Sequence, residues 1–349
     1  LLLRVNQRDQ AVTLLQNYRD QTGNPEIEAA LTRVAGGART LARPLTAARG
    51  AAIGVYGLGA LLSQETEADD GLVILSLATM LDPTLDAAQL AFAESQRDRG
   101  HNEAARAALA RLPQASPYAE TASLMSAWTL RDDGEQEAAL AAARQAAATG
   151  GRRSKTAYAD LLRTYDHYSE AEPLYTELIG EGSDDWRLYF ARGASRERLG
   201  RWSDAEADLQ HALQIEPDQP DVLNYLGYSW VDRGEHLQEG LALITRALEA
   251  RPNSGAILDS LGWAHYRLGD YEMALGYLER AVELEPSDPI LNDHLGDCYW
   301  RVGRRVEARF QWRRVLTLKP SGDLEAQAQS KIEAGLPRTP LAENARRRQ

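Results

Sequence analysis

Small residues recur along this chain at a spacing of about 34 residues. The first series runs through Gly59, Ala93, Ala127, Ala159, Gly193, Gly227, Gly262 and Gly296. A second series follows it by twelve or thirteen residues and consists of Gly71, Ala105, Ala139, Ala171, Ala205, Gly240, Ala274 and Ala308. A fixed period of this length is typical of a chain built from one repeated unit, each of which can bury its apolar face only against its neighbours. The sequence therefore predicts a stack of similar units.

Two short antiparallel helices in close contact explain both series. A large side chain where the helices cross would hold their backbones apart, so each helix needs a small residue there. The segments RLGD, RLGR, RVGR and RDRG place a glycine between the helices, where a tight turn needs a positive φ. Proline cannot continue a helix, and a third series of prolines closes five of the units. Its members are Pro83, Pro217, Pro252, Pro286 and Pro320.

On these residues the chain resembles the tetratricopeptide repeat family, whose pattern is W-x2-L-G-x2-Y, then A-x3-F, A and P. The match is sharpest in DSLGWAHYRLGDYEMALGYLERAVELEP and in NDHLGDCYWRVGRRVEARFQWRRVLTLKP. The resemblance implies an all-α fold, a right-handed α-solenoid of about eight or nine helical hairpins. Before residue 183 the repeats keep their spacing, but alanine often replaces glycine at the first small position.

The spacing predicts six segments. The segment around Ala11 is interpreted as the second helix of a repeat whose first helix would precede Leu1, so we expect the natural protein to extend upstream. The predicted segments are the end of a truncated upstream repeat (1–35), a linker (36–49), four degenerate repeats (50–182), four well-matched repeats (183–320), a capping helix (321–336) and a disordered basic tail (337–349).

Composition and charge exclude several classes of function. The formal net charge of −12 disfavours a nucleic-acid partner, because contacts to phosphate need a basic face. The longest nearly uncharged run, residues 50–64, is too short to span a bilayer, so we expect no transmembrane helix. Cys298 is the single cysteine, which excludes an internal disulfide and a cysteine metal cluster.

A search for catalytic chemistry finds no motif. The six histidines show no metal-ligand spacing, and the chain contains neither a nucleophile elbow nor a phosphate-binding glycine loop. His265 stands where the repeat places a packing tyrosine, and Cys298 lies at a helix-packing position, so both are interpreted as structural. The sequence predicts a non-enzymatic protein with no catalytic residue, no metal site and no cofactor.

The family resemblance implies that one face of each first helix lines a concave groove, at positions three before, one after and four after the first small residue. The predicted groove residues are Phe190, Ala194, Glu197, Asn224, Tyr228, Val231, Asp259, Trp263, Tyr266, Asp293, Asp297 and Trp300. We expect an aromatic and acidic groove that binds proteins or extended peptides. The alternative is that the aromatic residues only pack against the next repeat. Chaperone-binding members of the family carry lysine or arginine where this chain has Asn224, Asp259 and Asp293, which argues against a C-terminal carboxylate as ligand.

The last third of the chain has a narrower resemblance. The phrases LDSLGWA and DHLGDCYWRVGRR, with the one-residue insertion in DRGEHLQEG, are similar to proteobacterial envelope lipoproteins of the family. These act as adaptors that gather a carboxyl-terminal processing protease and its cell-wall hydrolase substrates. The resemblance implies the periplasmic side of the bacterial envelope and a lipid anchor upstream of Leu1; a cytoplasmic location is the alternative. Two other functions remain open: the regulatory part of a larger enzyme, and a scaffold for outer-membrane or lipopolysaccharide assembly.

Overall fold

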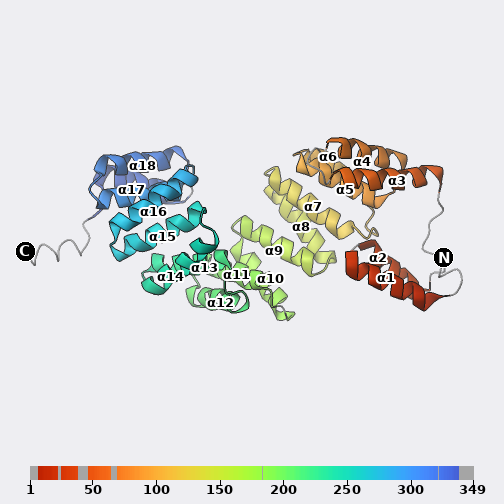
Figure 1. The fold of residues 1–349 in the computed structure, drawn as a ribbon, viewed down its shortest axis with the longest axis horizontal. Coiled ribbons are helices and arrows are strands. Elements are labelled where there is room, and N and C mark those ends of the chain that lie inside the picture. The colour runs from red at the N-terminus through yellow and green to blue at the C-terminus, as the bar shows by residue number, and fades with distance from the viewer. Residues whose placement is uncertain are drawn as a thin grey trace, which may run out of the picture. The chain divides into compact units, whose positions relative to one another are not determined.

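The computed structural model describes residues 7–22, 25–37, 46–63, 69–182, 184–320 and 322–337. Within these ranges the chain forms 19 α-helices and no β-strand (Figure 1). The helices pack in consecutive pairs, as expected for helical hairpins. The prediction of an all-α solenoid fold is therefore confirmed. The chain divides into two units, Leu1–Glu181 and Gly182–Gln349.

The first unit contains ten helices in the part of it that the structure describes. Each odd-numbered helix packs against the even-numbered helix that follows it. The pairs are α1 (Arg8–Thr22) with α2 (Pro25–Ala35), α3 (Ala47–Leu62) with α4 (Asp69–Leu81), α5 (Asp86–Asp98) with α6 (Asn102–Leu109), α7 (Ala119–Asp132) with α8 (Gln136–Thr149), and α9 (Arg152–Thr164) with α10 (Tyr168–Gly180).

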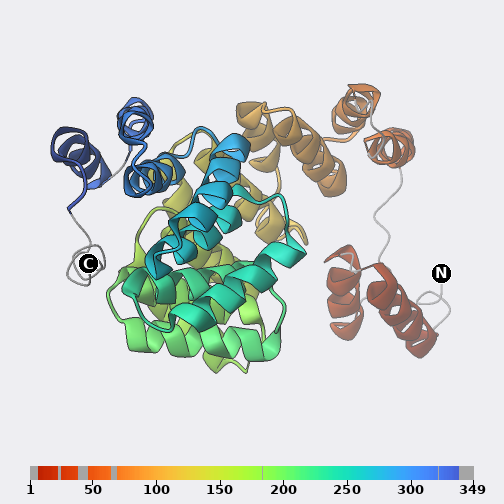
Figure 2. The same cartoon turned by 60° about the vertical axis from the view of Figure 1, so that its left-hand side comes forward.

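The described part of the second unit contains four helical hairpins followed by a single helix. The first helices of neighbouring hairpins also touch, because α13 contacts α15 and α15 contacts α17. Both views show these hairpins, coloured green to blue, following one another along the stack (Figures 1 and 2). The hairpins are α11 (Trp186–Arg198) with α12 (Trp202–Ile215), α13 (Pro220–Arg233) with α14 (Leu237–Ala250), α15 (Gly255–Leu268) with α16 (Tyr271–Leu284), and α17 (Pro289–Arg301) with α18 (Arg305–Thr317). The single helix, α19 (Leu324–Ala334), packs on α18.

The small residues lie at the helix crossings, as the spacing predicted. A Cβ atom on Gly262 would come within 2.6 Å of the Leu278 side chain in the partner helix. A Cβ atom on Gly227 would lie 2.8 Å from the carbonyl oxygen of Gly240, so two glycines face each other at that crossing. Real Cβ contacts are not this short, so a larger residue would push the helices apart.

The turns also follow the sequence pattern. The turn glycines have positive φ, for example Gly200 at 74° and Gly269 at 87°. Between α9 and α10 no glycine is present, and Asp166 adopts the left-handed conformation instead, with φ of 63°. His236, at φ of 44°, accommodates the one-residue insertion before α14. Each proline of the third series lies two or three residues beyond the second helix of its hairpin.

The predicted linker and tail lie partly outside the residues that the structure describes. Helix α3 begins at Ala47, inside the predicted linker 36–49, and residues 38–45 of that linker lie outside the described residues. The predicted disordered tail, apart from Pro337, also lies outside them. Near the beginning, Ala11 is buried in the α1–α2 hairpin. None of the helices that the structure describes is both long and apolar enough to cross a membrane.

Candidate partner-binding site

Three stacked rings form the centre of the candidate site, on the first helices of the second unit. Trp263 lies on α15, and its indole ring is almost parallel to the ring of Tyr266, one turn later, with centroids 4.6 Å apart. His294 on α17 stacks with the same indole at 4.1 Å and 12°. We call Trp263, Tyr266 and His294 the ring stack. Trp263 and Tyr266 are half-buried, so part of the stack is open to solvent.

Carboxylates hold the ring stack in place. Asp259, one turn before Trp263, is 4% exposed, and its Oδ2 atom lies 2.8 Å from Nδ1 of His294. Burial alone lowers the pKa of His294, but the charge of Asp259 and the hydrogen bond to it outweigh that effect, so this pKa lies above its usual value. The indole Nε1 of Trp263 donates to Asp232 on α13 at 3.3 Å. The imidazole therefore stacks on an oriented indole, and Asp259 favours its protonated form, for which this is a favourable cation–π arrangement.

Tyr228 on α13 extends the aromatic surface toward the preceding hairpin. Its ring is half-buried and lies 6.5 Å from the ring of His294. Burial raises the pKa of its hydroxyl, and the nearby carboxylates of Asp232 and Asp259 raise it further. The hydroxyl therefore stays protonated and can donate a hydrogen bond to a partner.

The earlier part of the predicted groove, on α11 and α13, is also brought together. Phe190 packs edge-on against the ring of Tyr225 at 5.6 Å, and the Tyr225 hydroxyl donates to Glu197 at 3.1 Å. Asn224 is half-buried, and its Oδ1 atom is buried without a hydrogen-bond partner among the described residues. An unpaired buried amide oxygen is costly, which marks Asn224 as a place where a donor from a ligand would be stabilised.

The prediction of an acidic groove is wrong at its C-terminal end. Asp293 and Asp297 are 5% and 6% exposed, and Lys331 of α19 lies 2.6 Å from the first and 2.8 Å from the second. Asp297 also accepts a hydrogen bond from the indole of Trp312 at 2.9 Å. Burial, together with the neighbouring Asp293 charge, raises the pKa of Asp297. Both carboxylates are thus buried and paired with Lys331 and do not offer charge to a partner, although Oδ1 of Asp293 has no hydrogen-bond partner among the described residues.

Three further predicted groove residues pack within the protein. Val231 is fully buried in the apolar core between α13 and α14, because it lies beside the close crossing of these helices. Trp300 packs at 5.4 Å against Trp312, and the guanidinium groups of Arg305 and Arg309 lie over its ring. Its ring is half-buried and packs against α18 and the end of α19, so packing accounts for part of its surface. Ala194 is buried as well.

Sequence reasoning missed three members of the site. His294, Asp232 and Lys331 do not occupy the positions that the repeat resemblance assigns to the groove. His294 stands two residues before the first small residue of its helix, and Lys331 comes from the capping helix. A weak signal was present in the sequence, because a histidine next to Asp293 has the charge to pair with an acid of the preceding repeat.

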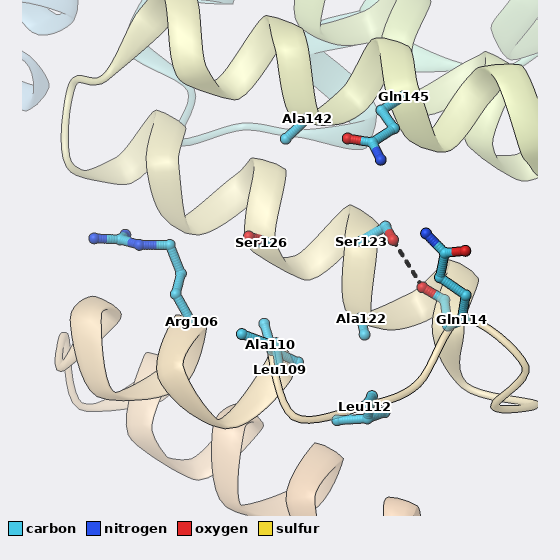
Figure 3. A pocket seen from close by; sticks show the side chains of 11 residues that line it. Arg106, Leu109, Ala110, Leu112, Gln114, Ala122, Ser123, Ser126, Ala142 and Gln145 are labelled. Carbon is cyan, nitrogen blue, oxygen red and sulfur yellow. Dashed lines mark hydrogen bonds between the residues drawn. The ribbon is translucent and has the colours of Figure 1, made fainter.

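The first unit contains a cleft between α6, α7 and α8 (Figure 3). Helix α6 has 8 residues, whereas α8 has 14, so the missing turns leave part of α7 uncovered. The resulting cleft has a volume of about 240 Å³. Ser123 and Ser126 form its floor and Gln145 one wall. The hydroxyl of Ser123 already donates to the carbonyl oxygen of Ala119 at 2.9 Å.

The candidate catalytic side chains are structural. Cys298 is fully buried, and burial, followed by the charge of nearby carboxylates, raises its pKa to about 12, so it is not a nucleophile at neutral pH. His265 packs parallel to the ring of Tyr277 at 5.6 Å, as expected of a packing residue. Among the described residues no group of three or more histidine, cysteine, aspartate or glutamate side chains could hold a metal ion.

Comparison with protein families finds tetratricopeptide repeats in the middle of the chain. Residues 156–220, 190–255 and 234–286 match tetratricopeptide repeat models. The matched part, which includes most of α9, all of α10 and the hairpins α11–α12, α13–α14 and α15–α16, therefore consists of these repeats. The expected repeat identity is confirmed for this part of the chain.

The chain is also similar to individual proteins of this type. It is 33% identical over 120 residues to a tetratricopeptide repeat-containing protein of Pseudomonas aeruginosa, a match that spans 34% of this chain and 20% of that protein. Among solved structures, a tetratricopeptide repeat protein from Parabacteroides merdae has a TM-score of 0.60 and 14% identity, over 71% of this chain and 98% of that one. The APC/C hetero-tetramer Cut9-Hcn1 gives a TM-score of 0.60 and 17% identity, over 81% of this chain and 55% of that one.

Proposed function

We propose that this chain is an adaptor that binds extended segments of partner proteins along the first helices of its second unit, with the ring stack as the main anchor. Proteins built from tetratricopeptide repeats generally act as protein-interaction scaffolds, and nothing in the described residues indicates catalysis. The observation that carries the proposal is the half-exposed Trp263, stacked between two rings and fixed by buried or hydrogen-bonded carboxylates.

The surroundings of the ring stack specify what such a segment should contain. Asp259 is paired with His294, and Asp232 lies near Arg267, so the carboxylates near the rings are neutralised within the protein. Charge therefore contributes little to selection, and the rings offer flat apolar area at low entropic cost. A segment with an apolar or aromatic side chain fits best, with its main chain hydrogen-bonded by Tyr228 and Asn224.

The finer proposal is that the partners are a carboxyl-terminal processing protease and its cell-wall hydrolase substrates, on the periplasmic side of a bacterial envelope. Its support is the sequence resemblance of the last third, in which DHLGDCYWRVGRR supplies His294 of the ring stack. An adaptor of this kind would hold the protease and its substrate on one solenoid, which raises the effective concentration of each for the other.

Affinity capture from an envelope extract tests the proposal. The full chain should retain a serine protease or a cell-wall hydrolase, and Trp263→Ala should reduce the amount retained by tenfold or more, since anchor tryptophans are frequent hot spots. Trp202→Ala is the matched control, because Trp202 lies on α12, outside the ring stack. Retention unchanged by Trp263→Ala would refute the ring stack as anchor. Recovery of outer-membrane or lipopolysaccharide assembly proteins in place of a protease would favour the assembly scaffold.

A further inference from the structure

The basic residues of the second unit are concentrated around one helix. The protein has a formal net charge of −12, yet residues 301–320 contain seven basic side chains and a single acid, Glu307. The basic residues are Arg301, Arg304, Arg305, Arg309, Arg313, Arg314 and Lys319. Helix α18 spans most of this segment, so it forms a positive region on an acidic protein.

The outward face of α18 also exposes large apolar side chains. The helix buries Ala308, Trp312 and Val315, at spacings of four and three, against the rest of its unit. On the other face, Val306 is 80% exposed and Phe310 is 65% exposed. These two lie one turn apart and are therefore neighbours on the helix surface. Paired apolar residues surrounded by charged ones are typical of an interaction surface.

The arginines around this apolar pair still have free hydrogen-bond donors. Arg305 contacts only the ring of Trp300 among the described residues, at 5.1 Å. Arg313 and Arg314 are exposed, and neither has an ion-pair or side-chain hydrogen-bond partner in the described part of the chain. Guanidinium groups match carboxylates through two parallel hydrogen bonds, so this arrangement is suited to an acidic ligand.

We propose that Arg305, Val306, Phe310, Arg313 and Arg314, together the α18 patch, are a second docking surface that binds an acidic, apolar-containing segment of a partner protein. Val306 and Phe310 would be covered by an apolar side chain of the segment, and the arginines would bind its carboxylates. The patch uses none of the residues of the ring stack, so the proposal does not depend on the function proposed above.

The neighbouring helix argues for a protein segment rather than an anionic membrane. Helix α16 packs on α17, which is the hairpin partner of α18. Helix α16 contains three glutamates, Glu272, Glu279 and Glu283, and only one arginine. A bilayer is a continuous negative surface, and any of these glutamates that lies within a Debye length of about 10 Å of it would repel its headgroups. A peptide segment can contact the α18 patch alone.

Binding of defined probes to the full chain tests this inference. The first probe is a fluorescein-labelled helical peptide of glutamate, leucine and alanine, and the second is the same peptide with glutamine in place of glutamate. Fluorescence anisotropy should show at least tenfold tighter binding of the glutamate peptide, with an affinity that falls as salt is raised. Phe310→Ser should weaken this binding about tenfold, and the double variant Arg313→Glu with Arg314→Glu should weaken it by at least as much.

Matched variants separate the α18 patch from general charge and from the ring stack. Met273→Ser and Arg280→Glu change an exposed methionine and an exposed arginine of α16, and both should bind the glutamate peptide as the unaltered chain does. Trp263→Ala should also bind it normally, since it affects only the ring stack. Unaltered far-ultraviolet circular dichroism should show that each variant is folded, as expected of exposed positions and checked separately for the half-buried Trp263.

Three results would overturn the inference. The first is equal affinity for the glutamate and glutamine peptides. The second is binding to vesicles of phosphatidylcholine and phosphatidylglycerol that Phe310→Ser abolishes, which would assign the patch to a membrane. The third is self-association of the chain that the same substitution abolishes, which would assign the patch to a second copy.

Discussion

Replacing Lys331 with methionine removes the one cation that lies within ion-pair distance of both Asp293 and Asp297 in the described chain. Methionine keeps the unbranched length of the side chain but loses its charge. The two carboxylates are each 8% exposed at the side chain and would remain buried next to each other. Removing one partner of a buried ion pair typically costs about 3–5 kcal/mol. Lys331 itself is 16% exposed, so some water reaches the site, and we expect a loss near the lower value, about 3 kcal/mol at pH 7.

The expected loss depends on pH in a definite direction. Burial and the charge of Asp293 already raise the pKa of Asp297, and without Lys331 this pKa should rise further. As the pH falls, protonation of Asp297 relieves the repulsion in the variant, so the difference from the unaltered chain should shrink. The pKa of Lys331 is raised in the folded protein, because the two carboxylates outweigh its burial. The contribution of Lys331 to stability is therefore complete below about pH 10.5 and stays constant at neutral and acidic pH.

Hydrogen exchange localises the effect, because the hairpins of a solenoid open separately. A loss of about 3 kcal/mol corresponds to a roughly hundredfold faster exchange of α19 and the adjoining α17, relative to the unaltered chain. Adding Asp293→Asn should restore much of the protection, since it removes one of the two repelling charges. The reasoning would be refuted by exchange that stays unchanged in α19, or by a loss that persists undiminished at pH 5 and in the double variant.

Three other outcomes follow from the packing. Gly262→Val should destabilise the second unit by about 1–3 kcal/mol in urea unfolding, because its Cβ would meet Leu278, whereas Gly276→Ala, which meets nothing within 4 Å, should not destabilise it. The raised pKa of His294 stabilises the folded protein; this stabilisation is complete below about pH 6.5 and is lost as the pH rises through the higher pKa of the folded state. The melting temperature should therefore fall over that pH range, and Asp259→Asn should remove the fall. Backbone amides of α5–α10, whose crossings carry alanine, should exchange faster than those of α11–α18; equal protection would contradict this.

The helical hairpins could be predicted from the sequence because their determinants are local. A glycine at a crossing and a proline after a helix act through contacts that recur in every unit, so a period of about 34 residues is enough to locate them. Gly296 illustrates this, because a Cβ atom there would come within 2.6 Å of Trp312 on α18, the other helix of the same hairpin. The stop of α6 at Leu109 was not predictable in the same way, since the repeat spacing continues through it.

The state of the groove residues could not be predicted, because it depends on what the next repeat supplies. Trp263 and Asp297 hold equivalent positions in successive repeats, yet Trp263 stacks on a histidine of the next hairpin and is half-buried, while Asp297 is 6% exposed and paired with Lys331 of α19. Repeat position gives the direction in which a side chain points. Whether it meets solvent or another helix is decided by partners about 35 residues away, as the Asp259–His294 pair shows.

The dependence of each groove residue on the next repeat also explains how the series of hairpins ends at α19. Asp293 is one repeat after Asp259 and occupies the equivalent position of its helix. In the earlier repeat the acid pairs with His294 of the following hairpin, and in the later one it pairs with Lys331 of α19. Helix α19 thus supplies the cation that a further hairpin would have provided, but it supplies no ring. The stacked rings therefore end at the buried His294, and we expect a bound segment to run from Trp263 toward α11 and not across α19.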